Sequence, residues 1–278
     1  MYILSYKKMK DEGSTILPPE PIVPEIPELS DLVTLGILPK YVSEFTNADI
    51  GTIVSIPYTD ASGNITGPIE FEVVGVNHHK DIHDESKPTI TLMSKNVLRY
   101  AAFDGKEPTN PLFDDWENAN ARADYGNNRW AVSNIRQWLN SNGAANEWFT
   151  PQHEYDEAPT YTDAPGFLAG FSDEVKQHFA IVRNKTLLCD ADRSTLSKDF
   201  EETEDKVFLP SYTEMGFGNL DDNNPEGTWL SNKFIDDESI IKTKSSKDAS
   251  YWLRSLYINY SYYVYKINQI RLCIRKRC

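Results

Sequence analysis

The hydrophobic period changes along this chain, and that change limits the possible folds more than any other feature of the sequence. Between residues 50 and 78, two β-branched runs, TIVSI and IEFEVVGV, flank turn residues that include Gly63 and Gly67. Two such runs around a turn are typical of a β-hairpin. The run TITLMSKNVL at residues 89–98 predicts one further strand.

The period then becomes helical. Val132, Ile135, Trp138 and Leu139 recur at three- and four-residue spacing, and the polar residues that follow end the pattern. A second helix is predicted at residues 172–182, because a serine at its start can cap it and two acidic residues suit its positive end.

The second half of the chain returns to β character after long loops. The stretch VFLPSYTE predicts a strand and then a helix start, in which Ser211 and Glu214 have capping-box spacing. Residues 216–248 are rich in Asn, Asp, Gly and Ser and are expected to form surface loops, and residues 250–278 again favour strands. This order of elements predicts an α+β fold with short antiparallel sheets, two main helices and long loops.

The N-terminal segment differs from the rest in composition. LPPEPIVPEIP at residues 17–27 favours extended, semi-rigid backbone. We therefore expect residues 1–28 to form an arm or attachment segment, or else a disordered tail, and residues 29–278 to form the folded domain. The lysines of MYILSYKKMK follow a very short apolar patch, which is the reverse of a signal peptide, so we expect synthesis in the cytoplasm.

Charge and cysteine content narrow the function classes. A net charge of −14 disfavours nucleic acid as a partner, because an acidic surface repels phosphate. No apolar run approaches the roughly 18 residues of a membrane-spanning helix. Three cysteines cannot build a disulfide framework, which fits folding in a reducing compartment.

Two segments could hold a metal ion. NHHKDIHDE contains three histidines, and His79 and His83 would share one face of a helix, but the segment joins two predicted strands, so a solvated loop is the favoured reading. NLDDNNPEG at residues 219–227 offers oxygen ligands for a structural calcium ion, without the ordered spacing of a twelve-residue calcium loop. No other cofactor is expected, because no nucleophile elbow, phosphate-binding glycine loop or HExxH stretch is present.

The C-terminal strip is the strongest candidate for function. Six of the 15 tyrosines fall between Tyr251 and Tyr265, and no acidic residue follows Asp248. Tyrosine offers a large amphipathic area at a low cost in conformational entropy, so it suits binding surfaces. Strand alternation would turn Ile258 and Val264 inward and the neighbouring side chains outward. The predicted ligand-binding residues are Arg254, Tyr257, Asn259, Tyr260, Tyr262, Tyr263 and Tyr265. The alternative is an ordinary half-buried sheet.

Several separate stretches, in order, resemble one protein family. YGNNRWAVSNIRQWLNS, EWFT, GFLAGFSDEV, KVFLPSYTEM and YWLRS lie between residues 125 and 255. Together they resemble the DUF6273 family, which is common in Firmicutes and their phages and is often attached to tail or surface proteins. With GTIVSIP and FEVVGV as the opening hairpin, the resemblance spans roughly residues 48–265.

The resemblance implies a C-type lectin-like fold of the formylglycine-generating-enzyme subtype. This fold also carries the variable receptor-binding proteins that retroelements diversify, and the residue types from Tyr257 to Tyr263 match those of their variable positions. The implied function is a non-enzymatic binding protein of a phage tail or bacterial surface, in the form of a homotrimer. Its partners would be a host-cell protein or glycan and, through the N-terminal arm, other proteins of the particle.

Two alternatives remain open. One is a copper-dependent oxidase of the formylglycine-generating type, because CIRKRC separates Cys273 and Cys278 by four residues, as in that enzyme's site. The other is a structural particle protein with the tyrosine strip at a subunit interface. The end of the chain also departs from the family pattern, because it lacks a strand similar to GVRPALCI.

Overall fold

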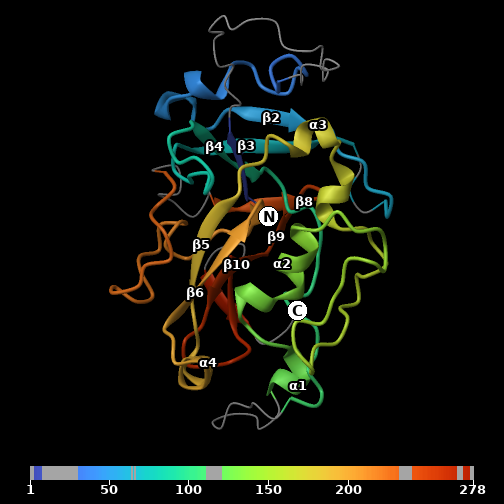
Figure 1. Ribbon diagram of the computed structural model, residues 1–278, viewed down its shortest axis with the longest axis vertical. Helices are drawn as coiled ribbons and strands as arrows, with labels where there is room; N and C mark the ends of the chain where they lie inside the picture. The colour runs from blue at the N-terminus through green and yellow to red at the C-terminus, as the bar shows by residue number, and fades with distance from the viewer. Residues whose placement is uncertain are drawn as a thin grey trace, which may run out of the picture.

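The computed structural model describes residues 3–7, 31–63, 65, 67–110, 121–231, 240–267 and 272–275. Along the longest axis, the strands β2, β3 and β4 lie toward one end, and the short helices α1 and α4 lie toward the other (Figure 1). None of the helices in these ranges is long and apolar enough to cross a membrane.

A five-stranded antiparallel sheet contains much of the core. Its strands are β1 (Ile3–Lys7), β2 (Ile53–Ile56), β3 (Ile69–Val76), β4 (Thr89–Ser94) and β7 (Val207–Phe208), in the order β2-β3-β4-β1-β7. β2 and β3 form the predicted hairpin, with Val54 opposite Phe71. Every residue of β4 is buried, because this strand has neighbours on both sides and lies within the core.

The first strand corrects the predicted domain boundary. Ile3–Lys7 pairs with β4 along its whole length and with β7 at Ile3 and Leu4, so this part of the predicted arm belongs to the folded body. The residues of the N-terminal segment could not predict this pairing, because β4 and β7 lie far away in the sequence. The proline-rich run at 17–27 lies outside the described residues.

Three smaller antiparallel sheets complete the β structure. β10 (Tyr251–Leu256), β11 (Val264–Ile267) and β12 (Leu272–Arg275) form one sheet with β11 in the centre. β5 (Val182–Leu187) pairs with β6 (Phe200–Asp205), and β8 (Lys242–Lys244) pairs with β9 (Lys247–Ala249). The returning strands at the C-terminus confirm the β character predicted for that segment.

The helices are short. They are α1 (Ala121–Tyr125), α2 (Asn134–Leu139), α3 (Asp173–Lys176) and α4 (Asp190–Leu196), together with the 3-10 turns η1 (Val42–Glu44), η2 (Asn47–Asp49), η3 (Trp130–Val132) and η4 (Phe167–Gly170). Ser172 caps α3 as predicted, since its side chain accepts a hydrogen bond from Val175 N, but the helix ends before the predicted residue 182. The next strand already begins at Val182.

Large aromatic side chains fill the space between the helices and the sheets. Trp138 packs against Tyr161 and Phe167, and its indole N–H donates to the carbonyl of Pro165. Burying such side chains supplies a large share of the folding free energy. The result is a mixed α+β chain with few helices and short antiparallel sheets, which confirms the predicted fold class at this level.

Candidate functional site

The segment from Tyr257 to Tyr263, called the tyrosine loop below, joins β10 to β11. The amide of Tyr257 donates to the carbonyl of Tyr263 at 3.0 Å, and the amide of Tyr260 donates to the carbonyl of Tyr257 at 3.3 Å. The loop therefore closes on itself as a compact turn. This turn interrupts the strand alternation on which the sequence prediction relied.

Buried donors hold the loop from the protein interior. Asn128 donates through its side-chain amide to the carbonyls of Tyr260 at 2.6 Å and Tyr263 at 3.1 Å, and its own backbone amide donates to Ser261 at 3.2 Å. At the start of α4, the amide of Asp190 donates to the carbonyl of Ile258. Because these bonds use the carbonyls of the loop, they fix its backbone.

Arg122 of α1 adds a charged support. Its Nε donates to the carbonyl of Ser261 at 3.0 Å, and its Nη2 lies 2.6 Å from Asp192 Oδ2. Burial disfavours the charged guanidinium, but the Asp192 carboxylate outweighs burial and raises the pKa of Arg122. The support under the loop is therefore a buried pair of Arg122 and Asp192 in which the guanidinium stays charged at neutral pH.

The asparagines of the YGNNRWAVSN stretch explain the conformation of this region. Asn127 donates to Asp104 at 2.7 Å and to Glu107 at 2.6 Å, and the side-chain oxygen of Asn134 accepts the amide of Gly105. Burial raises the pKa of Asp104 well above its usual range. Asn134 thus gives a buried backbone amide the acceptor that irregular structure does not supply, whereas Asn127 joins two acidic side chains.

The rings of the loop form one connected aromatic group. Tyr257 stacks on Tyr260 with centroids 5.5 Å apart, Tyr260 lies 4.9 Å from Tyr263, and Tyr263 lies 4.5 Å from Tyr262. Tyr257, Tyr260 and Tyr263 are half-buried, and Asn259 is exposed. These four accessible polar side chains are called the tyrosine face below, and Ile258 is half-buried beside them in the sequence.

Three predicted binding residues lie in the interior instead. Tyr262 is 5% exposed and stacks on Tyr125 at 5.5 Å, whereas Tyr265 is 9% exposed and lies 5.0 Å from Tyr212. Burial raises the pKa of Tyr265 to about 12. The expected outward direction of Tyr265 is wrong, because β11 is the central strand of its sheet and both Val264 and Tyr265 are buried. Ile258, expected in the core, is half-buried.

Arg254 is the third of these residues, and it does not bring a cation to the surface. It is 1% exposed, and its two terminal nitrogens each lie 2.6 Å from one oxygen of Glu214. Burial alone would raise the pKa of Glu214, but Arg254 and His79 outweigh it and hold that pKa far below its usual range. Arg254 therefore joins the YWLRS stretch to the KVFLPSYTEM stretch as a structural ion pair.

The predicted capping box has its reciprocal hydrogen bonds but starts no helix. The amide of Ser211 donates to Glu214 Oε2 at 2.9 Å, and the amide of Glu214 donates to Ser211 Oγ at 3.0 Å. The segment forms turns rather than a helix. The Glu214 side chain instead points toward Arg254 and His79, two partners that local spacing could not reveal.

A cavity of about 1250 Å³ adjoins the tyrosine loop. Tyr125 and Tyr262 belong to its wall, and Trp252 and the exposed Tyr100 add further ring surface. The lining also holds both signs of charge, from Arg99, Lys106 and Lys266 and from Asp124, Glu157 and Asp248. Ring faces beside donors and acceptors suit a polar ligand that also has apolar faces.

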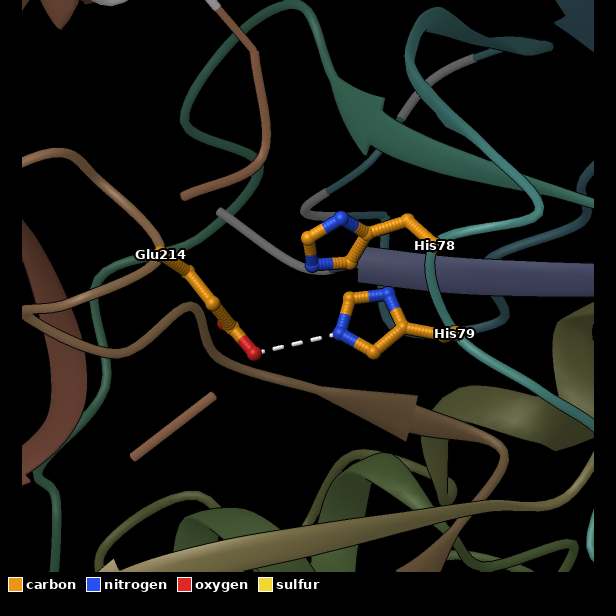
Figure 2. Close-up of side chains that lie close together, drawn as sticks. All are labelled: His78, His79 and Glu214. Atoms are coloured by element: carbon orange, nitrogen blue, oxygen red, sulfur yellow. Dashed lines mark hydrogen bonds and ion pairs between the residues drawn. The ribbon is translucent and has the colours of Figure 1, made fainter. Parts of the chain in front are cut away.

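The histidine-rich segment is a loop, as the sequence favoured, and several of its residues are exposed, but His79 is buried. His79 Nε2 lies 3.1 Å from Glu214 Oε1 (Figure 2). His79 Nδ1 lies 2.9 Å from Thr91 Oγ1. Within the described ranges, one group of three histidine, cysteine or acidic residues brings its ligand atoms together, and it consists of His78, His79 and Glu214. His83, the partner that helical spacing would have chosen, is exposed and outside this group.

The calcium and copper sites stay predictions. In the proposed calcium loop, Asp221 accepts hydrogen bonds from Asn223 and Asn224, and the buried Glu226 accepts a hydrogen bond from the Ser255 hydroxyl. Cys273 lies in β12, and Cys278 lies outside the described residues, so the copper site stays a prediction.

The fold and this site define a mixed α+β protein with a buried ion-pair network beneath an aromatic loop. The profile of the family described as Domain of unknown function (DUF6273) matches residues 88–276, which is more than half of the chain. The chain therefore belongs to the DUF6273 family, and the match includes the tyrosine loop but not the β2–β3 hairpin. No curated protein and no solved structure matches it.

Proposed function

We propose that this chain is a non-enzymatic binding module that uses the tyrosine face to contact a host-cell surface protein or glycan. The observation that carries the proposal is the combination of partly accessible tyrosine rings around Asn259 with a loop backbone held by buried donors. A loop that is already ordered loses little conformational entropy on binding, so more of the contact energy appears as affinity.

The chemistry of the face suits either partner class. Tyrosine rings stack on the apolar faces of sugars and fill pockets on proteins, and their hydroxyl groups both donate and accept hydrogen bonds. Tyr257, Asn259, Tyr260 and Tyr263 are the proposed contact residues. The buried Tyr262 and Tyr265 pack against Tyr263 and Tyr257, respectively. Arg254 is not a contact residue, because it lies in the buried ion pair with Glu214.

The biological setting is part of the same proposal. We place the chain among the C-type lectin-like, retroelement-diversified variable proteins, on a phage tail or bacterial surface, where the residue types of the tyrosine face would be the varied positions. Several copies on one particle, as in a homotrimer, would raise the apparent affinity of a weak contact without any new interaction. The N-terminal segment would attach the chain to the particle.

The test compares two sets of substitutions in fluorescently labelled protein. Whole Firmicutes cells and a printed array of bacterial glycans serve as probes. Tyr260→Ser with Tyr263→Ser removes two rings from the face, whereas Tyr41→Ser removes one ring that is 42% exposed in the N-terminal part of the domain. Losing two aromatic contacts is expected to weaken binding at least about tenfold, and the Tyr41 variant should bind like the wild type.

Equal binding by the double variant and the wild type would refute the proposal. If the double variant instead changes only the oligomeric state, as measured by light scattering, the tyrosine face is a subunit interface and the structural alternative is correct.

A further inference from the structure

A second cluster, separate from the tyrosine face, brings together side chains that ligate metal ions. His78 and His79 follow β3, and Glu214 lies in the turn after β7, so two distant segments supply the group. Figure 2 shows both imidazole rings beside the Glu214 carboxylate. One ligand atom from each of the three residues lies within 4.8 Å of the other two.

The His79 ring is oriented for coordination. Its Nδ1 lies 2.9 Å from Thr91 Oγ1, which turns Nε2 toward Glu214 Oε1 at 3.1 Å. Metal-bound histidines commonly have their second nitrogen held by a hydrogen bond in this way. Two ligands of a tetrahedral zinc ion lie about 3.3 Å apart when each bond is about 2.0–2.1 Å, so the His79–Glu214 spacing is suitable.

His78 places a third ligand atom beside them. The two histidine rings meet edge to face with centroids 4.6 Å apart. The His78 ring also forms a hydrogen bond with the backbone of Thr228.

Glu214 supplies a carboxylate to the cluster, and Arg254 offsets its charge. Glu214 and Glu226 are both buried and both interact with the single guanidinium of Arg254, and burial raises the pKa of Glu226. Arg254 already contacts both oxygens of Glu214, but each carboxylate oxygen has two lone pairs, so Oε1 can accept Arg254 and still coordinate a metal.

We propose that His78, His79 and Glu214 bind a divalent transition-metal ion of the zinc class through two nitrogens and one oxygen. The choice of metal follows from the ligands, because imidazole with one carboxylate suits zinc better than calcium or magnesium. The ion would connect the loop after β3 to the turn after β7 and, through Glu214 and Arg254, to β10. This metal site does not depend on whether the tyrosine face binds a partner.

The test uses the full chain with Cys273→Ser and Cys278→Ser, so that the thiols of CIRKRC cannot take up the metal. Protein freed of metal by a chelator is titrated with zinc against a chromophoric competitor, and cobalt(II) absorption reports the coordination geometry. We expect one zinc ion per chain. His78→Gln should weaken zinc binding at least about tenfold, because ligands matter at least as much as the groups that orient them. His83→Gln, which removes an exposed histidine from the same segment, should have no effect.

Three results would overturn the proposal. They are the uptake of less than one zinc ion per folded chain, wild-type affinity in His78→Gln, and equal losses in His78→Gln and His83→Gln. Circular dichroism of each variant confirms that a loss of binding does not come from unfolding, and the cobalt spectrum gives a second measurement on the unaltered histidines.

Discussion

Replacing Arg254 with methionine is expected to destabilise the protein by about 3–5 kcal/mol, because it leaves a buried charge without its partner. Methionine keeps the apolar stem, so the change mainly removes the guanidinium. That group donates to both oxygens of Glu214, to the carbonyl of Leu209 at 2.8 Å and to the carbonyl of Glu226 at 3.2 Å. Glu214 would keep only the amide of Ser211 and His79.

The same substitution at Arg183 is the matched control. Arg183 pairs with Glu202 and Glu204, but its side chain is 58% exposed. Exposed pairs contribute about 0–1 kcal/mol, so Arg183→Met should change stability little.

Urea unfolding at pH 7, followed by tryptophan fluorescence, measures both variants. The double variant Arg254→Met with Glu214→Met should lose less stability than the sum of the losses in the two single variants. The reason is that it removes both charges of the pair, so neither charge remains buried without its partner. A loss below about 1 kcal/mol for Arg254→Met, or additive losses in the double variant, would refute the reasoning.

Acid provides a second check on this ion pair. The pKa of Glu214 is depressed in the folded protein relative to its ordinary value of 4.5. A depressed carboxylate pKa adds stability that is present above the unfolded pKa and is lost as the pH falls through the folded pKa. The stability gap between the wild type and Arg254→Met should therefore narrow as the pH falls below about 4.5. A gap that stays constant from pH 7 to pH 3 would contradict the assignment.

Two further predictions concern the backbone around the tyrosine loop. Gly126→Ala should lower the urea midpoint more than Gly63→Ala does: both glycines have positive φ, but a Cβ at Gly126 would lie 2.1 Å from the carbonyl oxygen of Gly105, whereas Gly63 has open space. Equal losses in the two variants would show that the backbone around Gly126 moves to accommodate the added methyl group. Asn128→Ala should cost about 1–3 kcal/mol and speed amide hydrogen exchange in residues 257–263, because the carbonyls of Tyr260 and Tyr263 each lose one donor. Unchanged protection would mean that the loop does not depend on Asn128.

Local patterns were sufficient for the elements that depend on neighbouring residues. The β2–β3 hairpin, the start of β4 and the Ser172 cap follow from the residue pattern within each short segment, and the sequence predicted each of them. The reciprocal bonds of Ser211 and Glu214 belong to the same class, although no helix follows them. The family could also be identified from the order of short stretches.

Local sequence patterns could not predict contacts between segments that lie far apart in the sequence. β1 enters the sheet between β4 and β7, and the hydrogen bond between His79 and Glu214 joins residues 135 positions apart. Nothing in the composition of either segment marks its partner. Glu214 was therefore read as a helix cap, and the histidines were read as a solvated loop.

The tyrosine strip shows which properties the sequence determines and which the tertiary structure determines. The sequence alone determined that aromatic side chains gather near the C-terminus, since that is a property of residue order. Only the tertiary structure decided which rings reach solvent, because burial depends on what packs on each face. Tyr265 is covered in the central strand of a sheet, whereas Tyr260, five residues earlier, lies on a loop held from inside by Asn128.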